Sequence, residues 1–410
     1  MSASATAWRI QRLRYLLSVD PPVASYIRDD PDRMVSFLPM EAVGENGGLD
    51  LSREIRAADA LAGYTFVADG DVLLAKVTPC FENGKGSVVT GLVGGAGFAT
   101  TEVYTLRPGP DVHARFLDYL LQSRVFRAYG TARLTGAGGL KRLSATDLRN
   151  FEARIPSHGE QVAIADFLDR ETARIDTLIE EQQRLIDLLR ERRVDAVAGA
   201  LQGLQGRTRL KYRAIIQTGV TLNGEGDPAW PEWPYLRVAN VQVGRVDLTE
   251  VKTIRLKPED AAASSLLPGD VLMTEGGDID KLGRGALWSG HIPNALHQNH
   301  VFAVRPDEGL LPEFLVYVLD GPEARGYFMT TAKKTTNLAS TNKWTLGNLP
   351  LACPSVGEQR RVVNYLDEQI EKIDRLVAEA ERFIELSRER RAALITAAVT
   401  GQIDVRGTAA

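Results

Sequence analysis

Two histidines three residues apart, His297 and His300, come closest in this sequence to a metal-binding pair. A zinc site needs three or four ligands drawn from His, Cys, Asp and Glu. The chain has 5 histidines and 2 cysteines, and none of the others stands near this pair to complete a site. The pattern therefore favours polar positions on a strand, and we expect no bound metal.

A second candidate for chemistry is Asp20-Pro21-Pro22-Val23. It is similar to the Asn/Asp-Pro-Pro-aromatic loop with which amino-methyltransferases hold a flipped base. Here the fourth residue is valine, and no strand, glycine loop and helix for a methyl donor precede it. A surface turn is the better interpretation. Because no Ser/His/Asp, Cys/His or nuclease-like grouping has a supporting residue either, we expect a non-catalytic chain.

Basic and amide side chains gather in predicted loops, and they do so twice. Lysine and arginine suit phosphate contacts, and asparagine and threonine suit base edges. One such residue alone is usually a solvated surface charge, but these fall at equivalent positions of two similar halves. The candidate nucleic-acid contacts are Lys76, Lys85, Arg133, Lys141 and Arg142 in the first half, and Lys281, Arg284, Lys333, Lys334, Asn337, Asn342 and Lys343 in the second.

Composition limits the class of protein. The formal net charge is −4, so any nucleic-acid surface must be a local basic patch. Cys80 and Cys353 follow no metal or redox spacing, which suits a reducing compartment. No apolar stretch is long enough for a signal peptide or a membrane span. We expect a cytoplasmic protein.

The sequence segments that would position these loops occur twice in the chain. "PSHGEQ" at 156–161 returns as "PSVGEQ" at 354–359, and "GDVL" at 70–73 returns at 269–272. "RLRY" at 12–15 returns as "RLKY" at 209–212, and "RERR" at 190–193 returns at 388–391. A collinear series with nearly constant spacing indicates an internal duplication.

Each half divides into a mixed and a helical part. The mixed parts, about 15–155 and 212–353, combine short β-type runs with Gly/Pro turns and one helical stretch, which predicts α+β modules. Ser157 and Glu160 have the spacing of a helix capping box, as do Ser355 and Glu358. Gly203 and Gly401 are the expected helix ends.

Apolar residues recur every seven positions along both helical parts, which predicts a coiled-coil seam. We expect the two helices to pair antiparallel, with the modules related by an approximate two-fold axis. Polar letters in the seam, Gln182 and Ser387, leave open two separate domains that each bury their own helix. The predicted seam residues are Leu168, Ile175, Leu178, Leu185 and Leu189, with Leu366, Ile373, Leu376, Phe383 and Leu394.

The layout resembles the DNA-specificity subunit of type I restriction–modification systems. The first copy of the matching motifs is "PSHGEQ", Ile164, Phe167-Leu168-Asp169, Ile175-Asp176-x-Leu178 and the closing "RERR". The second is "PSVGEQ", Val362, Tyr365-Leu366-Asp367, Ile373-Asp374-x-Leu376 and the same closing run, after the module entry "RLKYRAIIQTGVTL" at 209–222. The match covers essentially the whole chain.

The resemblance implies target-recognition domains at 1–155 and 204–353, spacer helices at 156–203 and 354–403, and a tail at 404–410. Each recognition domain would read one half of a split, asymmetric site in double-stranded DNA. Two methyltransferase subunits would bring S-adenosylmethionine and methylate adenine N6. Restriction subunits with ATP and Mg²⁺ would add cleavage, so this chain would need no cofactor of its own. The alternative is a structural coiled-coil scaffold without sequence-specific DNA binding.

Overall fold

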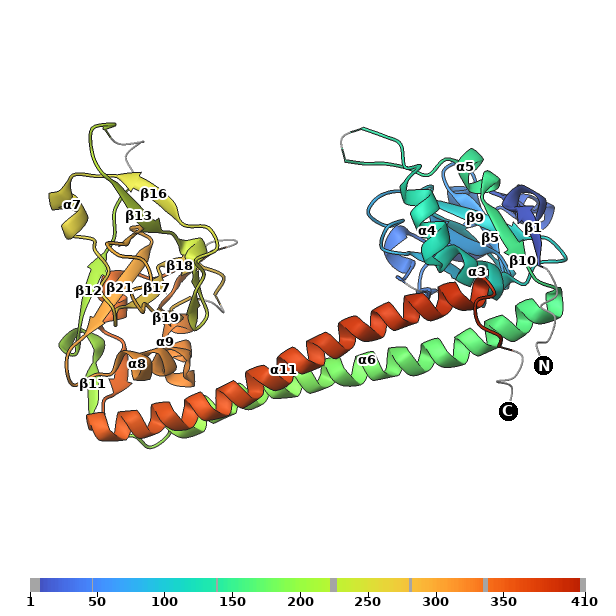
Figure 1. Cartoon of the computed structure of the whole chain (residues 1–410). Helices are drawn as coiled ribbons and strands as arrows, with labels where there is room; N and C mark the ends of the chain where they lie inside the picture. The colour runs from blue at the N-terminus through green and yellow to red at the C-terminus, as the bar shows by residue number, and fades with distance from the viewer. Residues whose placement is uncertain are drawn as a thin grey trace. The chain divides into compact units, whose positions relative to one another are not determined.

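The computed structural model describes residues 8–45, 47–137, 139–221, 227–279, 282–334 and 338–405. The chain forms two compact units (Figure 1). Unit 1 contains residues 1–183 and 381–410, and unit 2 contains residues 184–380. Each unit holds one α+β module and one part of each of two long helices, α6 (His158–Leu201) and α11 (Val356–Val399). Each unit therefore contains part of both helices, whereas the predicted domain boundaries separate the modules from the helices. The predicted boundaries remain a prediction.

Module 1 contains two four-stranded sheets and a two-stranded ribbon. The first sheet has the order β2-β9-β6-β7, the second β4-β3-β8-β5, and the ribbon pairs β1 with β10. The strands are β1 (Arg9–Arg12), β2 (Leu17–Val19), β3 (Met34–Leu38), β4 (Glu54–Arg56), β5 (Thr65–Ala68), β6 (Val72–Ala75), β7 (Gly86–Val88), β8 (Ala96–Ala99), β9 (Val103–Pro108) and β10 (Glu152–Ile155). The helices are η1 (Leu13–Tyr15), α1 (Ser25–Arg28), η2 (Met40–Ala42), α2 (Ala57–Ala60), η3 (Val93–Gly95), α3 (Ala114–Gln122), α4 (Arg124–Thr131) and α5 (Ala145–Asn150).

Module 2 repeats this plan. The sheet β12-β21-β17-β19 matches β2-β9-β6-β7, and β16-β13-β20 matches β4-β3-β8. The strands are β11 (Arg207–Arg209), β12 (Ala214–Thr218), β13 (Glu232–Leu236), β14 (Val241–Gln242), β15 (Arg245–Val246), β16 (Lys252–Arg255), β17 (Val271–Thr274), β18 (Gly276–Gly277), β19 (Gly285–Leu287), β20 (Leu296–His297), β21 (Val301–Pro306), β22 (Lys333–Lys334), β23 (Ala339–Ser340) and β24 (Pro350–Ala352). The helices are η4 (Leu210–Tyr212), η5 (Val238–Asn240), α7 (Pro258–Ala262), α8 (Pro312–Asp320), α9 (Pro322–Thr331) and α10 (Lys343–Gly347).

Most strand pairs in these sheets are antiparallel, and the duplication repeats a parallel pair in each module. Among antiparallel strands, β3 pairs parallel with β8 in module 1, and β13 pairs parallel with β20 in module 2. The predicted fold class of two tandem α+β modules with two long helices is confirmed.

The long helices begin and end where the sequence predicted. Ser157 N–H donates to Glu160 Oε2 at 3.1 Å and Glu160 N–H donates to Ser157 Oγ at 3.4 Å, which forms the capping box. At the second helix, Glu358 N–H donates to Ser355 Oγ at 3.3 Å. Gly203 and Gly401 follow the helix ends with φ of +76° and +74°. A glycine tolerates this left-handed conformation, which ends a helix.

Within each unit the two helix segments pack side by side and run antiparallel. In unit 1, Ile164 and Leu168 near the start of α6 share a core cluster with Ile395 and Val399 near the end of α11. In unit 2, Val197 near the end of α6 clusters with Leu366 and Ile370 of α11. The apolar seam therefore joins the helices in both units.

Four of the predicted seam residues are wrong by one position. Leu178, Leu185, Leu376 and Phe383 are 37%, 40%, 47% and 42% exposed. Their neighbours Ile186 and Ile384 are buried instead, at 1% and 6%. A heptad seam alternates steps of three and four residues. From Ile175 and Ile373 the next inward position is four residues on, not three. The structure buries Leu168, Ile175, Leu189, Leu366 and Ile373, and half-buries Leu394.

Among the described residues, no helix is both long and apolar enough to cross a membrane.

Candidate nucleic-acid interface

A buried glutamine fixes each module to the start of its helix. Gln161 is fully buried; its Oε1 accepts from His113 N–H at 2.8 Å, and its Nε2 donates to Asp111 O at 3.0 Å and Pro156 O at 3.1 Å. Gln359 repeats this set with Leu311 N–H, Gly309 O and Pro354 O, each at 2.8 Å. Because a buried amide satisfied on both ends tolerates little displacement, it sets the angle at which the helix leaves the module.

A tyrosine from each module secures the next turn of the helix. Tyr119 of α3 donates to Asp169 Oδ1 at 2.6 Å, and Tyr317 of α8 donates to Asp367 Oδ1 at 2.5 Å. Burial raises the pKa of both tyrosine hydroxyls, so they remain donors at neutral pH.

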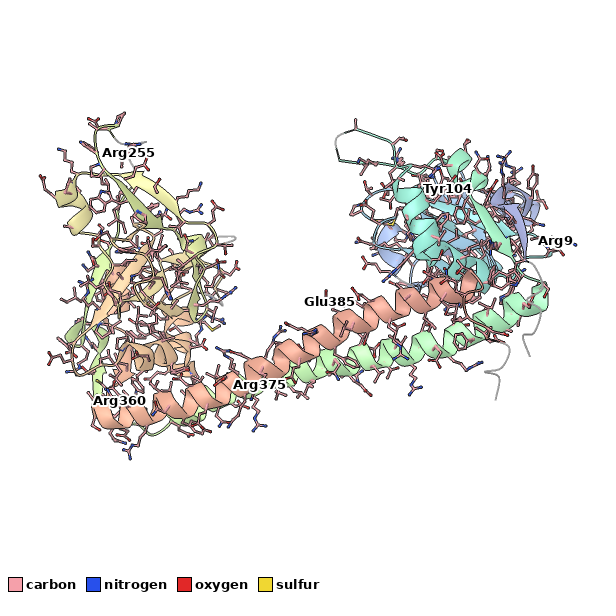
Figure 2. All side chains as sticks on the ribbon, in the orientation of Figure 1. Arg9, Tyr104, Arg255, Arg360, Arg375 and Glu385 are labelled. Atoms are coloured by element: carbon pink, nitrogen blue, oxygen red, sulfur yellow. The ribbon has the colours of Figure 1, made fainter. Side chains whose placement is uncertain are left out.

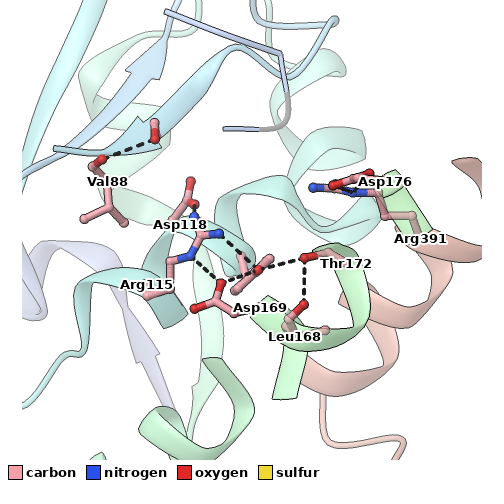
Figure 3. A network of polar contacts seen from close by, with 10 residues as sticks. Val88, Arg115, Asp118, Leu168, Asp169, Thr172, Asp176 and Arg391 are labelled. Carbon is pink, nitrogen blue, oxygen red and sulfur yellow. Dashed lines mark hydrogen bonds and ion pairs between the residues drawn. The ribbon is translucent and has the colours of Figure 1, made fainter. Parts of the chain in front are cut away.

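In unit 1 an arginine joins this junction (Figure 3). Arg115 contacts Asp169 Oδ1 through Nε at 2.7 Å and Asp118 Oδ2 through Nη1 at 2.6 Å, and Thr172 lies 3.1 Å from the Tyr119 hydroxyl. The equivalent positions in unit 2 are Glu313, Val316 and Ile370. The arginine-centred contacts of the first junction are therefore not repeated at these positions of the second.

The repeated "GDVL" places a buried acid inside each module. Asp71 is 2% exposed along its side chain and binds Arg107 through two contacts of 2.7 Å. Asp270 is fully buried and binds Arg305 at 2.7 and 2.8 Å. Two-point pairing of this kind joins β6 to β9 and β17 to β21, and keeps the main sheet rigid beneath the loops.

The structure brings several of the predicted basic residues of module 1 together. Leu143 N–H donates to Lys76 O, and Thr78 N–H donates to Lys141 O, both at 2.9 Å, so the loop after α4 lies along residues 76–78. Arg142 pairs with Val77 and Thr135 in isolated bridges. Lys141 and Arg142 are exposed, whereas Lys76 is half-buried with its Nζ 4.4 Å from the Tyr104 ring centroid. Figure 2 labels Tyr104 in module 1.

This arrangement forms a basic surface. Burial lowers the pKa of Lys76 and so does Arg142, whereas the nearby carboxylates of Asp20 and Glu102 act in the opposite direction. Arg133 is exposed at the end of α4 and lies 3.8 Å over the Tyr129 ring. The exposed Arg133, Lys141 and Arg142 thus supply the positive charge of this surface.

Two predicted residues lie elsewhere. Lys85 is half-buried and its Nζ donates to the Met40 carbonyl at 3.2 Å. Its counterpart Arg284 is also half-buried and lines a cavity of about 280 Å³ with Tyr317 of α8 and Asp367 of α11. Lys85 and Arg284 therefore contact other parts of the protein and do not lie with the exposed basic residues of the loops.

In module 2 the described loop residues follow α9. Lys333 and Lys334 are exposed on β22, which pairs with β23. Asn342 caps α10, because its Oδ1 accepts from Thr345 N–H at 2.9 Å, and Lys343 is exposed beside it. Lys281 and Asn337 lie outside the described residues.

The two histidines do not face one another. His297 is buried with Nδ1 2.6 Å from Val301 O, whereas His300 is exposed with Nδ1 2.7 Å from Glu275 Oε2. Burial lowers the pKa of His297. Asp20 lies in a bend with φ of +51°, and its Oδ1 accepts from Thr105 N–H at 2.9 Å. The side chains of the histidine pair and of Asp20 thus each contact another residue of their own module.

Sequence reasoning missed the glutamine and tyrosine anchors. The repetition of Gln161 and Gln359 inside the quoted hexapeptides was the available signal, because a helix cap explains the serine and glutamate but not the glutamine. Asp169 and Asp367 also recur in the quoted motifs.

Comparison with known proteins supplies the family context. No family model matches the chain. The chain is 31% identical over 183 residues to the type I restriction enzyme EcoEI specificity subunit of Escherichia coli, a match that covers 44% of this chain and 30% of that protein. The chain thus spans under two thirds of the length of this relative.

Solved structures cover nearly the whole chain. One is a chain from a structure on complex assembly and conformational transition of the type I R-M system, with a TM-score of 0.72, 19% identity, and coverage of 98% of this chain and 100% of that chain. The other is the HsdS subunit of Thermoanaerobacter tengcongensis, with a TM-score of 0.58, 18% identity, and coverage of 97% and 98%. The sequence relative and the shared fold together confirm the resemblance of this chain to the specificity subunits of type I restriction–modification systems.

Proposed function

We propose that this chain is the non-catalytic specificity subunit of a type I restriction–modification complex. Each module recognises one half of a split, asymmetric DNA sequence. The two helices set the length of the unread spacer between the half-sites. The basic loops beside Lys76 and on β22 supply DNA contacts.

The observation that carries this proposal is the duplication of the module together with its anchor. Both modules hold their helix through the same glutamine and tyrosine contacts. Two similar modules, each attached to its helix through the same contacts, suit a DNA site with two separate halves. A scaffold without DNA binding would not need exposed basic residues in the corresponding loops of both modules.

The partners and cofactors follow from the same proposal. Two methyltransferase subunits dock on the helical regions, bind S-adenosylmethionine and methylate adenine N6 on flipped bases. Restriction subunits, where present, bind ATP and Mg²⁺. The complex acts on DNA in the cytoplasm.

Genome-wide mapping of methylated adenines, with and without this gene, tests the proposal. We expect a two-part motif with a fixed gap whose methylation disappears on deletion and returns on complementation. An unchanged methylation pattern would refute it. Methyl transfer by the purified chain alone would instead indicate a catalytic protein.

A further inference from the structure

The same exposed turn occurs in both modules. Tyr15 on η1 is 75% exposed and Tyr212 on η4 is 67% exposed. Arg14 lies 5.9 Å from the Tyr15 ring centroid, and Lys211 lies 5.2 Å from the Tyr212 ring centroid. Each turn therefore presents a cation and an aromatic hydroxyl to solvent.

The fold does not require these exposed side chains. The residue that holds each turn is the preceding leucine: Leu13 and Leu210 are fully buried, and their N–H groups donate to Phe151 O and Leu349 O at 3.0 Å. A cation and a tyrosine that point away from the core contribute little to stability. Their repetition calls for a role outside the fold.

A further exposed arginine precedes each turn. Arg12 on β1 lies 2.9 Å from Glu152, and Arg209 on β11 lies 3.2 Å from the neutral Asn348, which also accepts from Lys211 at 2.8 Å. We call each of these two sets a basic–tyrosine stripe. The stripe of module 1 consists of Arg12, Arg14 and Tyr15, and the stripe of module 2 consists of Arg209, Lys211 and Tyr212.

Each stripe is linked to the basic loop of its module. In module 1, Leu13 N–H donates to Phe151 O directly after α5, the Tyr129 hydroxyl donates to Asp147 O of α5 at 3.0 Å, and Arg133 lies 3.8 Å over the Tyr129 ring. In module 2, Arg209 and Lys211 contact Asn348 directly after α10. The Tyr327 hydroxyl of α9 donates to Thr345 O of α10 at 2.8 Å, and Lys333 and Lys334 follow α9. The stripe and the basic loop are thus linked through one short helix in each module, α5 in module 1 and α10 in module 2.

The stripes and the loops differ in one respect. The counterparts of Arg133, Lys141 and Arg142 are Thr331, Ala339 and Ser340, so the loops diverge. The stripes keep their chemistry. Contacts that read bases must differ between modules that read different half-sites, whereas contacts to phosphates can stay the same.

We propose that the two basic–tyrosine stripes bind the phosphate backbone of DNA beside each half-site, independently of its sequence. This rests on the proposed function. A methyltransferase subunit would also be common to both modules. Phosphate is the better occupant, because Arg14 and Lys211 present positive charge at the same place in both modules of a chain whose net charge is −4.

The test uses the full chain with its methyltransferase subunits. Binding of Arg14→Gln combined with Lys211→Gln is measured over a salt series, on a duplex that carries the mapped site and on an unrelated duplex of equal length. We expect both affinities to fall by the same factor and the salt slope to decrease by about 1.8, since each lost phosphate contact removes about 0.9. The methylated sequence should not change.

Arg28→Gln combined with Lys257→Gln removes the same charge from exposed positions outside the stripes and serves as the matched control. An equal loss in this control, an unchanged salt slope or an altered methylated sequence would overturn the proposal. So would a variant that no longer assembles with methyltransferase in the absence of DNA, which would identify a protein-docking surface. Failure of the proposed function would look different, since the wild-type complex would then bind both duplexes equally.

Discussion

Arg391 of α11 forms an ion pair with Asp176 of α6, with its Nε 3.0 Å from Oδ1. The duplication repeats the pair in unit 2, where Arg193 Nη1 lies 2.7 Å from Asp374 Oδ1. The arginine side chain is 9% exposed in the first pair and 32% exposed in the second. The chain therefore carries the same interhelical contact at two degrees of burial.

We predict that Asp176→Asn destabilises the protein more than Asp374→Asn. Loss of a partner to a buried charge costs about 3–5 kcal/mol. We expect about 2 kcal/mol for Asp176→Asn, because the Asp176 side chain is 46% exposed. Asp374→Asn should cost under about 1 kcal/mol, as surface pairs do. Urea unfolding followed by circular dichroism measures both, and equal losses would contradict the burial argument.

The glutamine anchor predicts a larger effect than the helix cap beside it. Gln161→Ala removes three hydrogen bonds and leaves the backbone groups of residues 111, 113 and 156 without that partner. The expected cost is about 2–4 kcal/mol. Glu160→Ala, which removes the exposed capping contact, is the matched control and should cost about 1 kcal/mol. Thermal unfolding compares the two, and a Gln161→Ala variant no less stable than the control would refute the anchor.

Buried His297 predicts a pH dependence of stability. Burial lowers its pKa from the ordinary 6.5, so the unfolded chain takes up a proton that the folded chain does not. Its contribution is therefore complete above pH 6.5 and is lost as pH falls below that value, by up to about 1.4 kcal/mol per pH unit. We expect His297→Gln to have a flatter profile between pH 6.5 and 5 than wild type. His300→Gln controls for the loss of a histidine, and identical profiles for all three proteins would exclude this role.

The β22 lysines predict a change in DNA binding confined to one half-site. Lys333→Gln combined with Lys334→Gln should weaken binding and lower the salt slope by about 1.8. Because these loops diverge between the modules, methylation should become less selective in the half-site of module 2 only. Lys252→Gln combined with Lys257→Gln is the control in the same module. Affinity unchanged across the salt series would remove Lys333 and Lys334 from the interface.

The sequence predicted what depends on local rules. The duplication is visible as repeated motifs in the sequence. The helix ends follow from the capping serines and from glycines, which can adopt the positive φ that ends a helix. The seam was misplaced at Leu178 because Leu178 and Ile179 are adjacent and both apolar. Steps of three and four residues then fit the pattern equally well, and only packing against the neighbouring helix distinguishes them.

Contacts distant in sequence could not be predicted. Tyr119 meets Asp169 across 50 residues, and Asp71 meets Arg107 across 36. Single polar residues have no periodicity that names their partner. For the same reason the sequence treated Lys85 and Arg284 like the loop lysines, although the fold turns their side chains toward Met40 and toward the helices.

The spacer role of the helices predicts that helix length sets the gap in the recognised sequence. A seven-residue insertion between Gln183 and Arg184, with another between Phe383 and Ile384, preserves the heptad phase of both helices. Each helix grows by about 10.5 Å at ~1.5 Å per residue. At ~3.4 Å per base pair this corresponds to about three base pairs of spacer. Methylation mapping should show the same two half-sites with a longer gap. A three-residue insertion at the same points disrupts the seam and should abolish methylation; the original gap in the seven-residue variant would contradict the spacer role.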